Sequence, residues 1–390
     1  MTTHGLDAQM KIYSNMLLGQ GYDVPLSAEE WRDKARANLA DGPWWYVEGS
    51  AGAEATMDEN RQAFSRYKLC PRMLRNVADR DLRVTLFGKN YPMPFLLAPV
   101  GVQSIIHPDG ERASARAAAK SGIGYVLSTV SSVPMEEIAA VMGDAPRWFQ
   151  LYPGKDPEIV SSMVQRAETA GYGALVVTVD TTMLGWRMHD LKNAYLPFML
   201  GEGIANFLTD GAFTSRLAAS PAENQMAAIQ EFLNVYVNPA FTWEDLENVR
   251  KQTKLPLLVK GITHPEDAKM ALRMGADGLV VSNHGGRQVD GAIAALDALQ
   301  KIREVVGPNV TVLMDSGIRT AADILKAKAL GADAVLIGRP YVYALAAAGQ
   351  EGVEQWLFHM MAELDLQMAL AGYASIREVD STAVTAYPLR

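Results

Sequence analysis

The chain has 390 residues, enough for one barrel-sized domain or two ordinary ones, and its composition, 49% hydrophobic and 21% charged, is typical of a globular protein with a large core. Asp and Glu number 44 against 36 Lys and Arg, and the net charge of -8 argues against a nucleic acid or an anionic membrane as the main partner. The one cysteine, Cys70, excludes an intrachain disulfide and a cysteine metal cluster.

The beginning of the chain carries no targeting pattern. Its first twenty residues lack a basic stretch followed by a long apolar run, so we expect no secretory signal peptide. No window reaches about eighteen uninterrupted apolar residues, the length that a transmembrane helix needs. Because a single cysteine fits a reducing compartment, these patterns favour a cytoplasmic protein.

Residues 1–94 are expected to form an extension that begins with helices and then becomes mixed. The segment SAEEWRDKARANL opens with Ser27, and Glu30 follows three residues later. This spacing is the capping box of a helix start, in which each side chain bonds the backbone of the other residue.

Eight short apolar runs follow, and most are separated by ten to twenty residues of helical period. Each run is solidly apolar rather than alternating, as expected for parallel strands that are covered on both faces. The helical stretches before the sixth and eighth runs end on Gly275 and Gly331, and glycine supplies the left-handed cap of a helix. The runs are 95–101, 125–129, 148–152, 174–180, 255–261, 278–283, 311–317 and 334–339.

Eight strand-then-helix units predict a closed (β/α)₈ barrel of the α/β class, a TIM barrel. An open doubly wound sheet is the alternative, but its phosphate-binding glycines should follow the first strand. Here the glycine-rich turns follow strands six, seven and eight. We expect a single domain over residues 1–390, with the barrel at 95–350 and a C-terminal helical segment at 351–390.

One connection is unusually long, because about fifty residues, 188–241, separate the fourth and fifth strands. Loops of that length are commonly lids or disordered segments. The aromatic and leucine residues of this one favour an ordered, mobile lid over the site, with an oligomer contact as the alternative. Its apolar pieces are too short to span a bilayer, although they leave a peripheral membrane contact open.

Polar residues at the ends of the expected strands are the candidates for a functional site, because barrels carry their catalytic groups on the carboxyl face. Any one of them is as well explained by a structural role, but a converging set that includes one His, one Lys and several Arg predicts a site. The set is Gln150, Tyr152, Thr178, Asp180, Arg187, Lys260, Ser282, His284, Arg287, Asp315, Arg319 and Arg339.

One subset points to a phosphorylated ligand. The sequences DSGIR and IGRP end strands seven and eight, where barrels commonly bind phosphate. Gly317 and Gly338 would let backbone N–H groups approach the oxygens, and Arg319 and Arg339 would supply charge-assisted hydrogen bonds. The pattern does not name the ligand.

The other subset, His284 with Arg187 and Arg287, points to an acid substrate. Two guanidiniums beside an imidazole suit bidentate capture of a carboxylate, with a base above a neighbouring carbon. Lys260, in a dry strand end, would stabilise negative charge that develops on a cofactor. No pair of the six histidines has metal-site spacing, so no metal is expected.

Several motifs resemble those of the FMN-dependent α-hydroxy-acid oxidases and dehydrogenases, over nearly the whole chain. They are YVEGSAG, FQLY, LVKGI, SNHGGRQ, DSGIRTAADILKAKALGADAVLIGRP and AELDLQMALAG. The resemblance implies that FMN lies across the strand ends. The residues that it places against the flavin and its phosphate are Pro99, Val100, Gly101, Ser128, Gln150, Thr178, Lys260, Ser282, Asp315, Ser316, Gly317, Ile318, Arg319, Gly338 and Arg339.

The same resemblance gives the catalytic groups their roles. It implies that His284 is the base and that Asp180 stabilises the imidazolium once it forms. Lys260 would face the flavin edge that becomes negative on reduction. The residues that it assigns to the substrate carboxylate are Arg187, Arg287, Tyr46 and Tyr152.

Within this family the resemblance is strongest to the lactate 2-monooxygenases. It lies in the lid sequence LPFMLGEGIANFLTD, in CPRMLRNVADRDL, and in Gly101, where lactate oxidases typically carry alanine. It implies that O₂ oxidises L-lactate to pyruvate, and that peroxide decarboxylates the caged pyruvate to acetate, CO₂ and water. A slowly opening lid would favour this outcome, because product release then competes poorly with the second step.

Three alternatives remain at this stage. The first is an oxidase that releases the 2-keto acid and H₂O₂, from lactate or another 2-hydroxy acid. The second is a dehydrogenase that passes electrons to a cytochrome or quinone, for which neither a haem domain in the first ninety residues nor a membrane segment is apparent. The third is a barrel that binds FMN without catalysis. Family members are commonly tetramers or octamers, so a homo-oligomer is expected.

Overall fold

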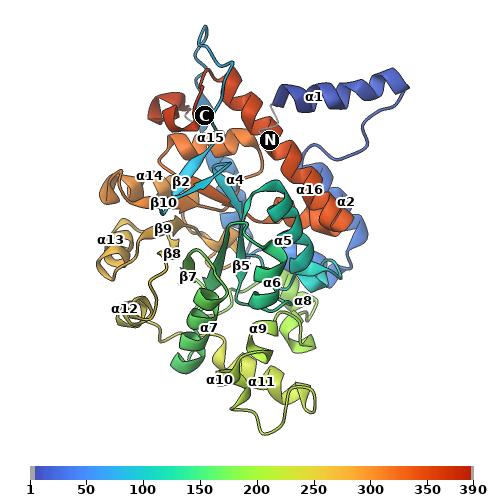
Figure 1. Ribbon diagram of the computed structural model, residues 1–390. Coiled ribbons are helices and arrows are strands. Elements are labelled where there is room, and N and C mark those ends of the chain that lie inside the picture. Colours follow the sequence, from blue (N-terminus) through green and yellow to red (C-terminus); the bar gives the residue numbers. More distant parts are fainter. Residues whose placement is uncertain (1–4, 388–390) are drawn as a thin grey trace.

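The structure, a computed structural model, describes residues 5–387 and is built around a closed barrel of eight parallel strands (Figure 1). The predicted segments that include residues 1–4 and 388–390 extend outside this range. Each strand pairs with the next along the chain, and pairing of Leu336 with Leu96 closes the ring. The (β/α)₈ prediction is therefore confirmed over the open sheet. The strands are β4 (Phe95–Leu97), β5 (Gly124–Ser128), β6 (Arg147–Leu151), β7 (Leu175–Thr178), β8 (Leu257–Ile262), β9 (Gly278–Val281), β10 (Thr311–Met314) and β11 (Ala334–Ile337).

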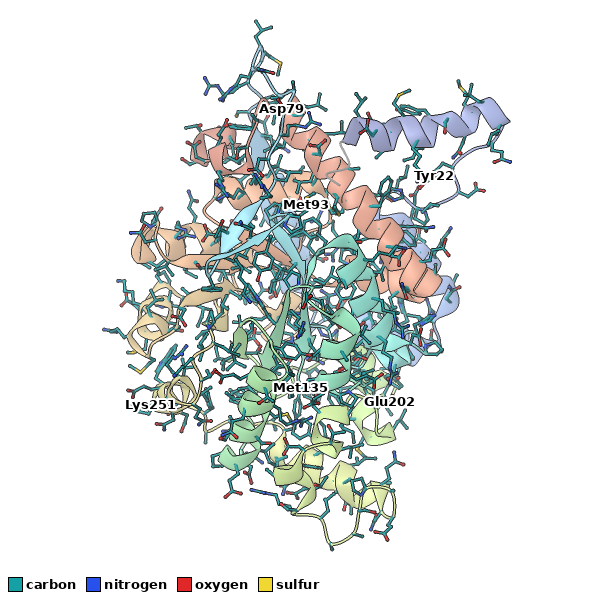
Figure 2. The ribbon with its side chains drawn as sticks, viewed as in Figure 1. Tyr22, Asp79, Met93, Met135, Glu202 and Lys251 are labelled. Atoms are coloured by element: carbon teal, nitrogen blue, oxygen red, sulfur yellow. The ribbon has the colours of Figure 1, made fainter. Side chains whose placement is uncertain are left out.

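Helices surround the barrel and bury the outer faces of its strands. Every residue of β5, β7, β9 and β11 is buried, which explains the solidly apolar runs. Met93 and Met135 lie in the packed interior, whereas Lys251 lies at the periphery (Figure 2). Gly275 and Gly331 follow α13 and α15 with φ of +92° and +112°, as predicted for left-handed caps. The helices are α5 (Gly110–Ser121), α6 (Met135–Met142), α7 (Pro157–Thr169), α12 (Trp243–Lys251), α13 (Pro265–Arg273), α14 (Ala295–Val306), α15 (Ala321–Ala329) and α16 (Arg339–Leu370).

The N-terminal extension is helical and then mixed, as the sequence predicts. Ser27 and Glu30 form the expected capping box, since the Glu30 N–H donates to the Ser27 side chain at 3.1 Å and the Glu30 carboxylate accepts from the Ser27 N–H. Strands β2 and β3 form a short antiparallel pair. The elements are α1 (Gly5–Tyr13), η1 (Ser14–Leu18), α2 (Ala28–Asn38), α3 (Asp41–Glu48), α4 (Ala55–Ser65), β1 (Tyr67–Leu69), β2 (Val84–Leu86) and β3 (Lys89–Tyr91).

The C-terminal segment differs from the helical segment that the sequence predicts. Helix α16 is kinked at Ala348 and Gly349 and ends at Leu370, where Gly372 takes a φ of +85°. The chain then forms η5 (Ile376–Glu378), η6 (Ser381–Ala383) and β12 (Val384–Ala386), which pairs antiparallel with β1. No helix within residues 5–387 has the length and apolarity that a membrane crossing requires.

The long connection 188–241 folds into short helices that lie at one end of the molecule, beside α7 (Figure 1). Phe207 and Phe232 pack edge to face with ring centroids 4.9 Å apart. The Asn206 amide donates to the Thr129 carbonyl at 2.9 Å and so fixes the segment to the end of β5. The connection is therefore ordered, as the sequence predicts, and its mobility as a lid stays a prediction. Its elements are α8 (Met188–Lys192), η3 (Pro197–Leu200), α9 (Ala205–Leu208), α10 (Gly211–Thr214) and α11 (Gln225–Val235).

Candidate active site

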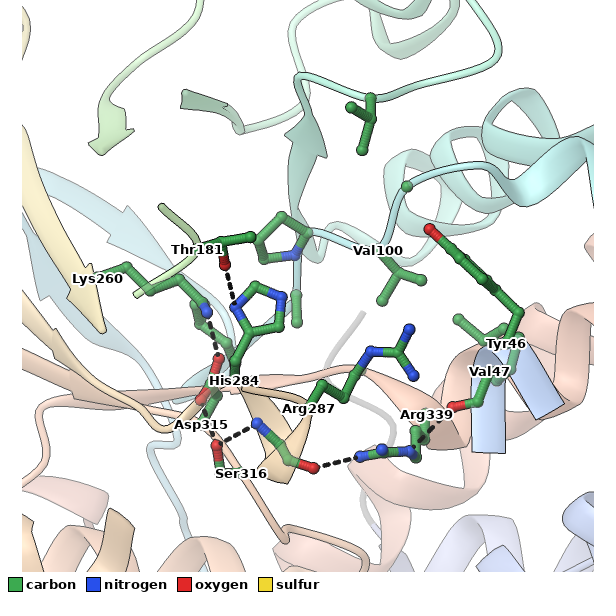
Figure 3. A pocket seen from close by; sticks show the side chains of 18 of the residues that line it. Tyr46, Val47, Val100, Thr181, Lys260, His284, Arg287, Asp315, Ser316 and Arg339 are labelled. Carbon is green, nitrogen blue, oxygen red and sulfur yellow. Dashed lines mark hydrogen bonds and ion pairs between the residues drawn. The ribbon is translucent and has the colours of Figure 1, made fainter. Parts of the chain in front are cut away.

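A cavity opens at the carboxyl ends of the barrel strands, where the predicted site residues converge (Figure 3). The space between its walls is about 1040 Å³, part of it open to solvent. Of the predicted residues, the cavity is lined by Tyr46, Pro99, Val100, Gly101, Tyr152, Arg187, Lys260, His284, Arg287, Asp315, Ser316, Gly317, Ile318, Arg319, Gly338 and Arg339.

His284 enters this cavity from a strained turn, η4 (His284–Gly286), directly after β9. Its φ is +58°, a left-handed conformation that residues other than glycine rarely adopt. Gly285 continues the turn at +65°, and the His284 N–H donates to Ser282 Oγ at 3.0 Å. Backbone strain of this kind is concentrated at functional sites, where the surrounding structure holds it.

Asp180, which follows β7, holds the imidazole of His284. Oδ1 of Asp180 lies 2.8 Å from Nδ1 of His284, and Thr181 Oγ1 donates to the same carboxylate oxygen at 2.9 Å. Burial raises the pKa of Asp180, but the charges of His284 and Lys260 outweigh it and lower this pKa to about 2. Because an ionised carboxylate only accepts hydrogen bonds, Nδ1 carries the proton and Nε2 keeps its lone pair.

His284 is therefore arranged as a base. Burial lowers its pKa below the usual 6.5, and Asp180 partly counteracts this shift. The imidazole is neutral at neutral pH and can take up a proton, and the buried carboxylate would stabilise the cation that results. The contact between His284 and Asp180 is compatible with the predicted roles of base and carboxylate partner, which stay predictions.

Arg187 and Arg287 lie on the cavity wall near His284. Nη2 of Arg187 donates to Gln288 Oε1 at 3.0 Å, and its Nε donates to the carbonyl of Arg287 at 3.2 Å. Nη1 of Arg287 donates to the Gly49 carbonyl at 2.7 Å, and its guanidinium lies 5.2 Å from the centre of the Tyr46 ring. Backbone, amide and aromatic partners orient both cations without neutralising them.

In the described part of the chain, the guanidiniums that line the cavity have no carboxylate counter-ion. Within residues 5–387, neither Arg187 nor Arg287 makes an ion pair with a carboxylate, and the same holds for Arg319 and Arg339. Burial, together with the charges of Arg187 and Arg339, lowers the pKa of Arg287 to about 9. Burial also lowers the pKa of Arg319. Such a cluster attracts anions, and its two ends suit a carboxylate and a phosphate.

The proposed phosphate end of the cavity is built from backbone and cations. Arg339 donates to the Val47 carbonyl at 3.0 Å, and Arg319 donates to the carbonyl of Ile318 at 2.9 Å. Gly317 has a φ of +99°, and a Cβ there would lie 2.7 Å from the Asn60 carbonyl oxygen, so only glycine fits.

Lys260 is a fixed cation at the end of β8. Its Nζ lies 3.4 Å from Oδ2 of Asp315 (Figure 3). The same Nζ donates to Ser282 Oγ at 3.1 Å. Burial lowers the pKa of Lys260, but Asp315 and Asp180 raise it above its ordinary value. The ammonium therefore stays charged beside the cavity, where it can stabilise negative charge.

Behind the cavity wall, three predicted flavin contacts form a buried chain. Ser128 Oγ donates to Gln150 Oε1 at 3.0 Å, and Gln150 Nε2 donates to Thr178 Oγ1 at 3.0 Å. In front of them runs the loop that contains Gly101, where a Cβ would lie only 2.5 Å from Cγ2 of Val130. The loop therefore passes too close to its neighbour for a larger residue without movement.

These features fit the FMN that the sequence implies. Two arginines without a carboxylate partner among the described residues and a glycine turn suit its phosphate, and Lys260 suits a site where charge develops. Ser128, Gln150 and Thr178 are not among the residues that line the cavity, so their contact with the flavin stays a prediction. Within the described part of the chain, no group of three or more His, Cys, Asp or Glu side chains could hold a metal ion.

The sequence analysis missed several residues of the site. Leu184, Phe198 and Tyr236 line the cavity, the last two from within the long connection. Their aromatic and aliphatic character was visible, but not which of them would face the site. Thr181 directly follows Asp180, the last residue of the fourth predicted strand, and Gln288 is the last letter of the motif SNHGGRQ.

The chain is similar to known flavoproteins. A family model described as FMN-dependent dehydrogenase matches residues 35–386. The L-lactate oxidase of Lysinibacillus sphaericus (strain C3-41) is 45% identical over 352 residues, which cover 90% of each protein. The 4-hydroxymandelate oxidase of Amycolatopsis orientalis is 44% identical over 331 residues, 85% of this chain and 90% of that one. A crystal structure of mandelate oxidase with (S)-4-hydroxymandelic acid is similar with a TM-score of 0.83 at 40% identity, covering 94% of this chain and 100% of that one.

Proposed function

This chain belongs to the FMN-dependent dehydrogenase family, and from that premise we propose that it oxidises L-lactate with O₂ and decarboxylates the retained pyruvate. The chain is an FMN-dependent oxidoreductase of the 2-hydroxy acid oxidase type. The finer assignment, lactate 2-monooxygenase, is our proposal. Its overall balance is lactate and O₂ giving acetate, CO₂ and water.

The covered cavity is the observation that carries this assignment. Phe198 and Tyr236, from the long connection, line the cavity and pack with ring centroids 5.4 Å apart. Phe232 stacks on Tyr236 at 4.9 Å, and Asn206 fixes the segment to the barrel. A cover anchored in this way favours slow escape of a small product, and a product that stays can react again.

The first half-reaction needs a clamp and a base. Arg187 and Arg287 would bind the substrate carboxylate, helped by the hydroxyls of Tyr46 and Tyr152, which line the same cavity. Nε2 of His284 would take up the proton that the substrate loses on oxidation. Bound FMN would supply the two-electron oxidation of the substrate and the reduction of O₂ to hydrogen peroxide.

The second half-reaction needs only that its reactants stay together. Pyruvate and hydrogen peroxide combine to acetate, CO₂ and water, so no further oxidant or reductant is required. The clamp arginines would hold the pyruvate carboxylate as they hold that of lactate, since both are 2-substituted acids of the same length. Retention raises the effective concentration of peroxide beside the keto group.

The test of this proposal is the product balance under air. We expect the purified holoenzyme to convert L-lactate to acetate with one O₂ consumed per acetate and little free peroxide. Equal amounts of pyruvate and free hydrogen peroxide, measured without catalase, would overturn the monooxygenase assignment and leave an oxidase.

An oxidase that releases pyruvate and hydrogen peroxide is the second candidate. The similarity to an L-lactate oxidase favours it. Gly101 favours the monooxygenase, because by the resemblance lactate oxidases typically carry alanine at this position. The same product balance decides between the two.

We also propose that the protein is a cytoplasmic homo-oligomer, a tetramer or an octamer. Exposed apolar side chains on α1 and η1 support an interface there, since Met16 and Leu17 are 76% and 82% exposed. Light scattering of the purified holoenzyme measures the mass, and a monomer would contradict the proposal.

A further inference from the structure

The side-chain amide of Gln288 uses its full hydrogen-bonding capacity on one short segment of the chain. Its Oε1 accepts from Arg187 Nη2 at 3.0 Å and from the Gly185 N–H at 3.3 Å. Its Nε2 donates to the carbonyls of Asp180 and Met183, each at 2.8 Å. A primary amide has two donor hydrogens and two acceptor lone pairs, so no capacity is left.

The segment that Gln288 holds is residues 181–187, which we term the strap. Thr181, Leu184 and Arg187 of the strap line the cavity. Its other large side chains make little apolar contact, because Met183 is 61% and Trp186 is 72% exposed. Hydrogen bonds rather than packing must therefore keep the strap in place.

Few other hydrogen bonds hold the strap in the described structure. The Gly52 N–H donates to the Trp186 carbonyl at 2.9 Å, and Arg187 Nε donates to the Arg287 carbonyl at 3.2 Å. The Thr181 hydroxyl donates to Asp180 Oδ1 at 2.9 Å and lies 3.2 Å from His284 Nδ1. The Arg187 carbonyl accepts from the Leu191 N–H at 3.0 Å. Among residues 5–387, Gln288 contributes the largest share, and it alone bonds both the backbone of the strap and the guanidinium of Arg187.

We propose that Gln288 is a positioning residue that sets the Arg187 guanidinium for the substrate carboxylate and fastens the strap over the cavity. The inference rests on the proposed function, in which Arg187 is half of the carboxylate clamp. Gln288 does not need to touch the substrate. It acts through Arg187 and through the backbone on either side of Thr181.

The neutral amide matters for this role. A carboxylate at position 288 would still accept from Arg187, but its negative charge would compete with the substrate for the same guanidinium. It would also present oxygen to the carbonyls of Asp180 and Met183, where the amide presents donors. Glutamine orients the cation and leaves its charge for the substrate.

Two variants separate these contributions. Gln288→Met keeps a side chain of similar length and removes all four hydrogen bonds. Gln288→Glu keeps the acceptor for Arg187 and adds the competing charge. Gln165→Met is the matched control, because Gln165 is exposed and bonds only Ser161, at 3.3 Å, far along the chain on α7.

The experiment is a titration of each holoenzyme with oxalate, an unreactive small dicarboxylate, followed by the change in flavin absorbance. We expect the dissociation constant to rise about tenfold in Gln288→Met and further in Gln288→Glu, with FMN content and Tm near those of the parent. In turnover, KM for L-lactate should rise more than kcat falls. Gln165→Met should match the parent throughout.

Dissociation constants within twofold of the parent in both variants would overturn the inference. A fall of Tm, FMN content and oxalate affinity together in both variants would also overturn the inference, because a merely structural role gives that result. If Gln288→Met does not fold, Gln288→Glu tests the inference alone. Its competing charge should raise the dissociation constant for oxalate by more than about tenfold.

The proposed function fails by a different result. A parent holoenzyme that binds oxalate but forms no acetate from L-lactate would overturn the monooxygenase assignment. The ratio of oxalate affinities between parent and Gln288 variants would still decide the inference about Gln288.

Discussion

Nδ1 of His284 and Oδ1 of Asp180 lie 2.8 Å apart, although the two residues follow strands β9 and β7, which are not neighbours in the barrel. Strand β8 runs between them, and its Lys260 is charged and buried. The closed barrel thus brings a base, its carboxylate partner and a fixed cation to three successive strand ends. This placement is rigid, because every strand is hydrogen-bonded on both sides.

Replacing Asp180 with Asn should slow the reductive step about 10²- to 10⁴-fold, the usual contribution of positioned acid–base groups. The amide cannot stabilise an imidazolium and can impose the wrong tautomer on His284. Rapid-mixing of anaerobic holoenzyme with L-lactate measures the rate. Asp144→Asn, at an exposed position, is the matched control and should retain the parent rate.

A rate of Asp180→Asn within threefold of the parent would contradict the role of this carboxylate. FMN content distinguishes the two explanations for a slow variant, since loss of the flavin would indicate a damaged fold rather than a missing partner for His284.

The pH dependence should show an acid limb set by His284. Burial lowers the pKa of this imidazole below 6.5, so its neutral form is present above that pKa and is lost as the pH falls through it. Asp180, with a pKa of about 2, stays ionised throughout. We expect kcat/KM to be level near neutrality and to fall below pH 6.5, whereas an acid limb centred above pH 7 would contradict this assignment.

Replacing Arg319 with Met should weaken FMN binding about 10- to 100-fold, the equivalent of one charged hydrogen bond. Arg319 has no carboxylate partner in the described structure, so the variant breaks no ion pair that the fold needs. Fluorescence titration of the apoprotein with FMN measures the dissociation constant. Arg273→Met, an exposed arginine on α13, should leave it unchanged, and an unchanged value for Arg319→Met would contradict the phosphate role.

Replacing Gly101 with Ala should shift the products from acetate toward pyruvate and free hydrogen peroxide. The new Cβ would lie 2.5 Å from Cγ2 of Val130. Either the loop that contains position 101 or the loop that contains Val130 must therefore move, at the place where the flavin ring is expected. A slower reaction with O₂ gives pyruvate more time to leave. Gly211→Ala, where a Cβ meets nothing within 4 Å, is the control, and an unchanged acetate fraction in Gly101→Ala would contradict this role.

The barrel could be predicted from the sequence because its strands are buried on both faces and so are apolar throughout. The polar site residues could be predicted because the carboxyl ends of barrel strands meet, which brought His284, Arg187 and Arg287 to one cavity. For these parts a local pattern was sufficient.

Other parts depend on contacts that leave no local pattern. Strands β1 and β12 have three residues each, all half-buried or exposed, so neither carries an apolar signal for the pairing that ends the chain. Phe198 and Tyr236 line the cavity from within the long connection, where Phe232 packs against both. The bonds of Gln288 to the strap likewise depend on tertiary structure.

The most direct test of the site is anaerobic reduction of the flavin by L-lactate in the parent and in His284→Ala. We expect the parent holoenzyme to bleach with one equivalent of lactate, and the variant to stay yellow with FMN bound, slower by at least about 10²-fold. Reduction of the variant at the parent rate, or a parent that lactate does not bleach, would contradict the proposed roles of His284 and its two arginines.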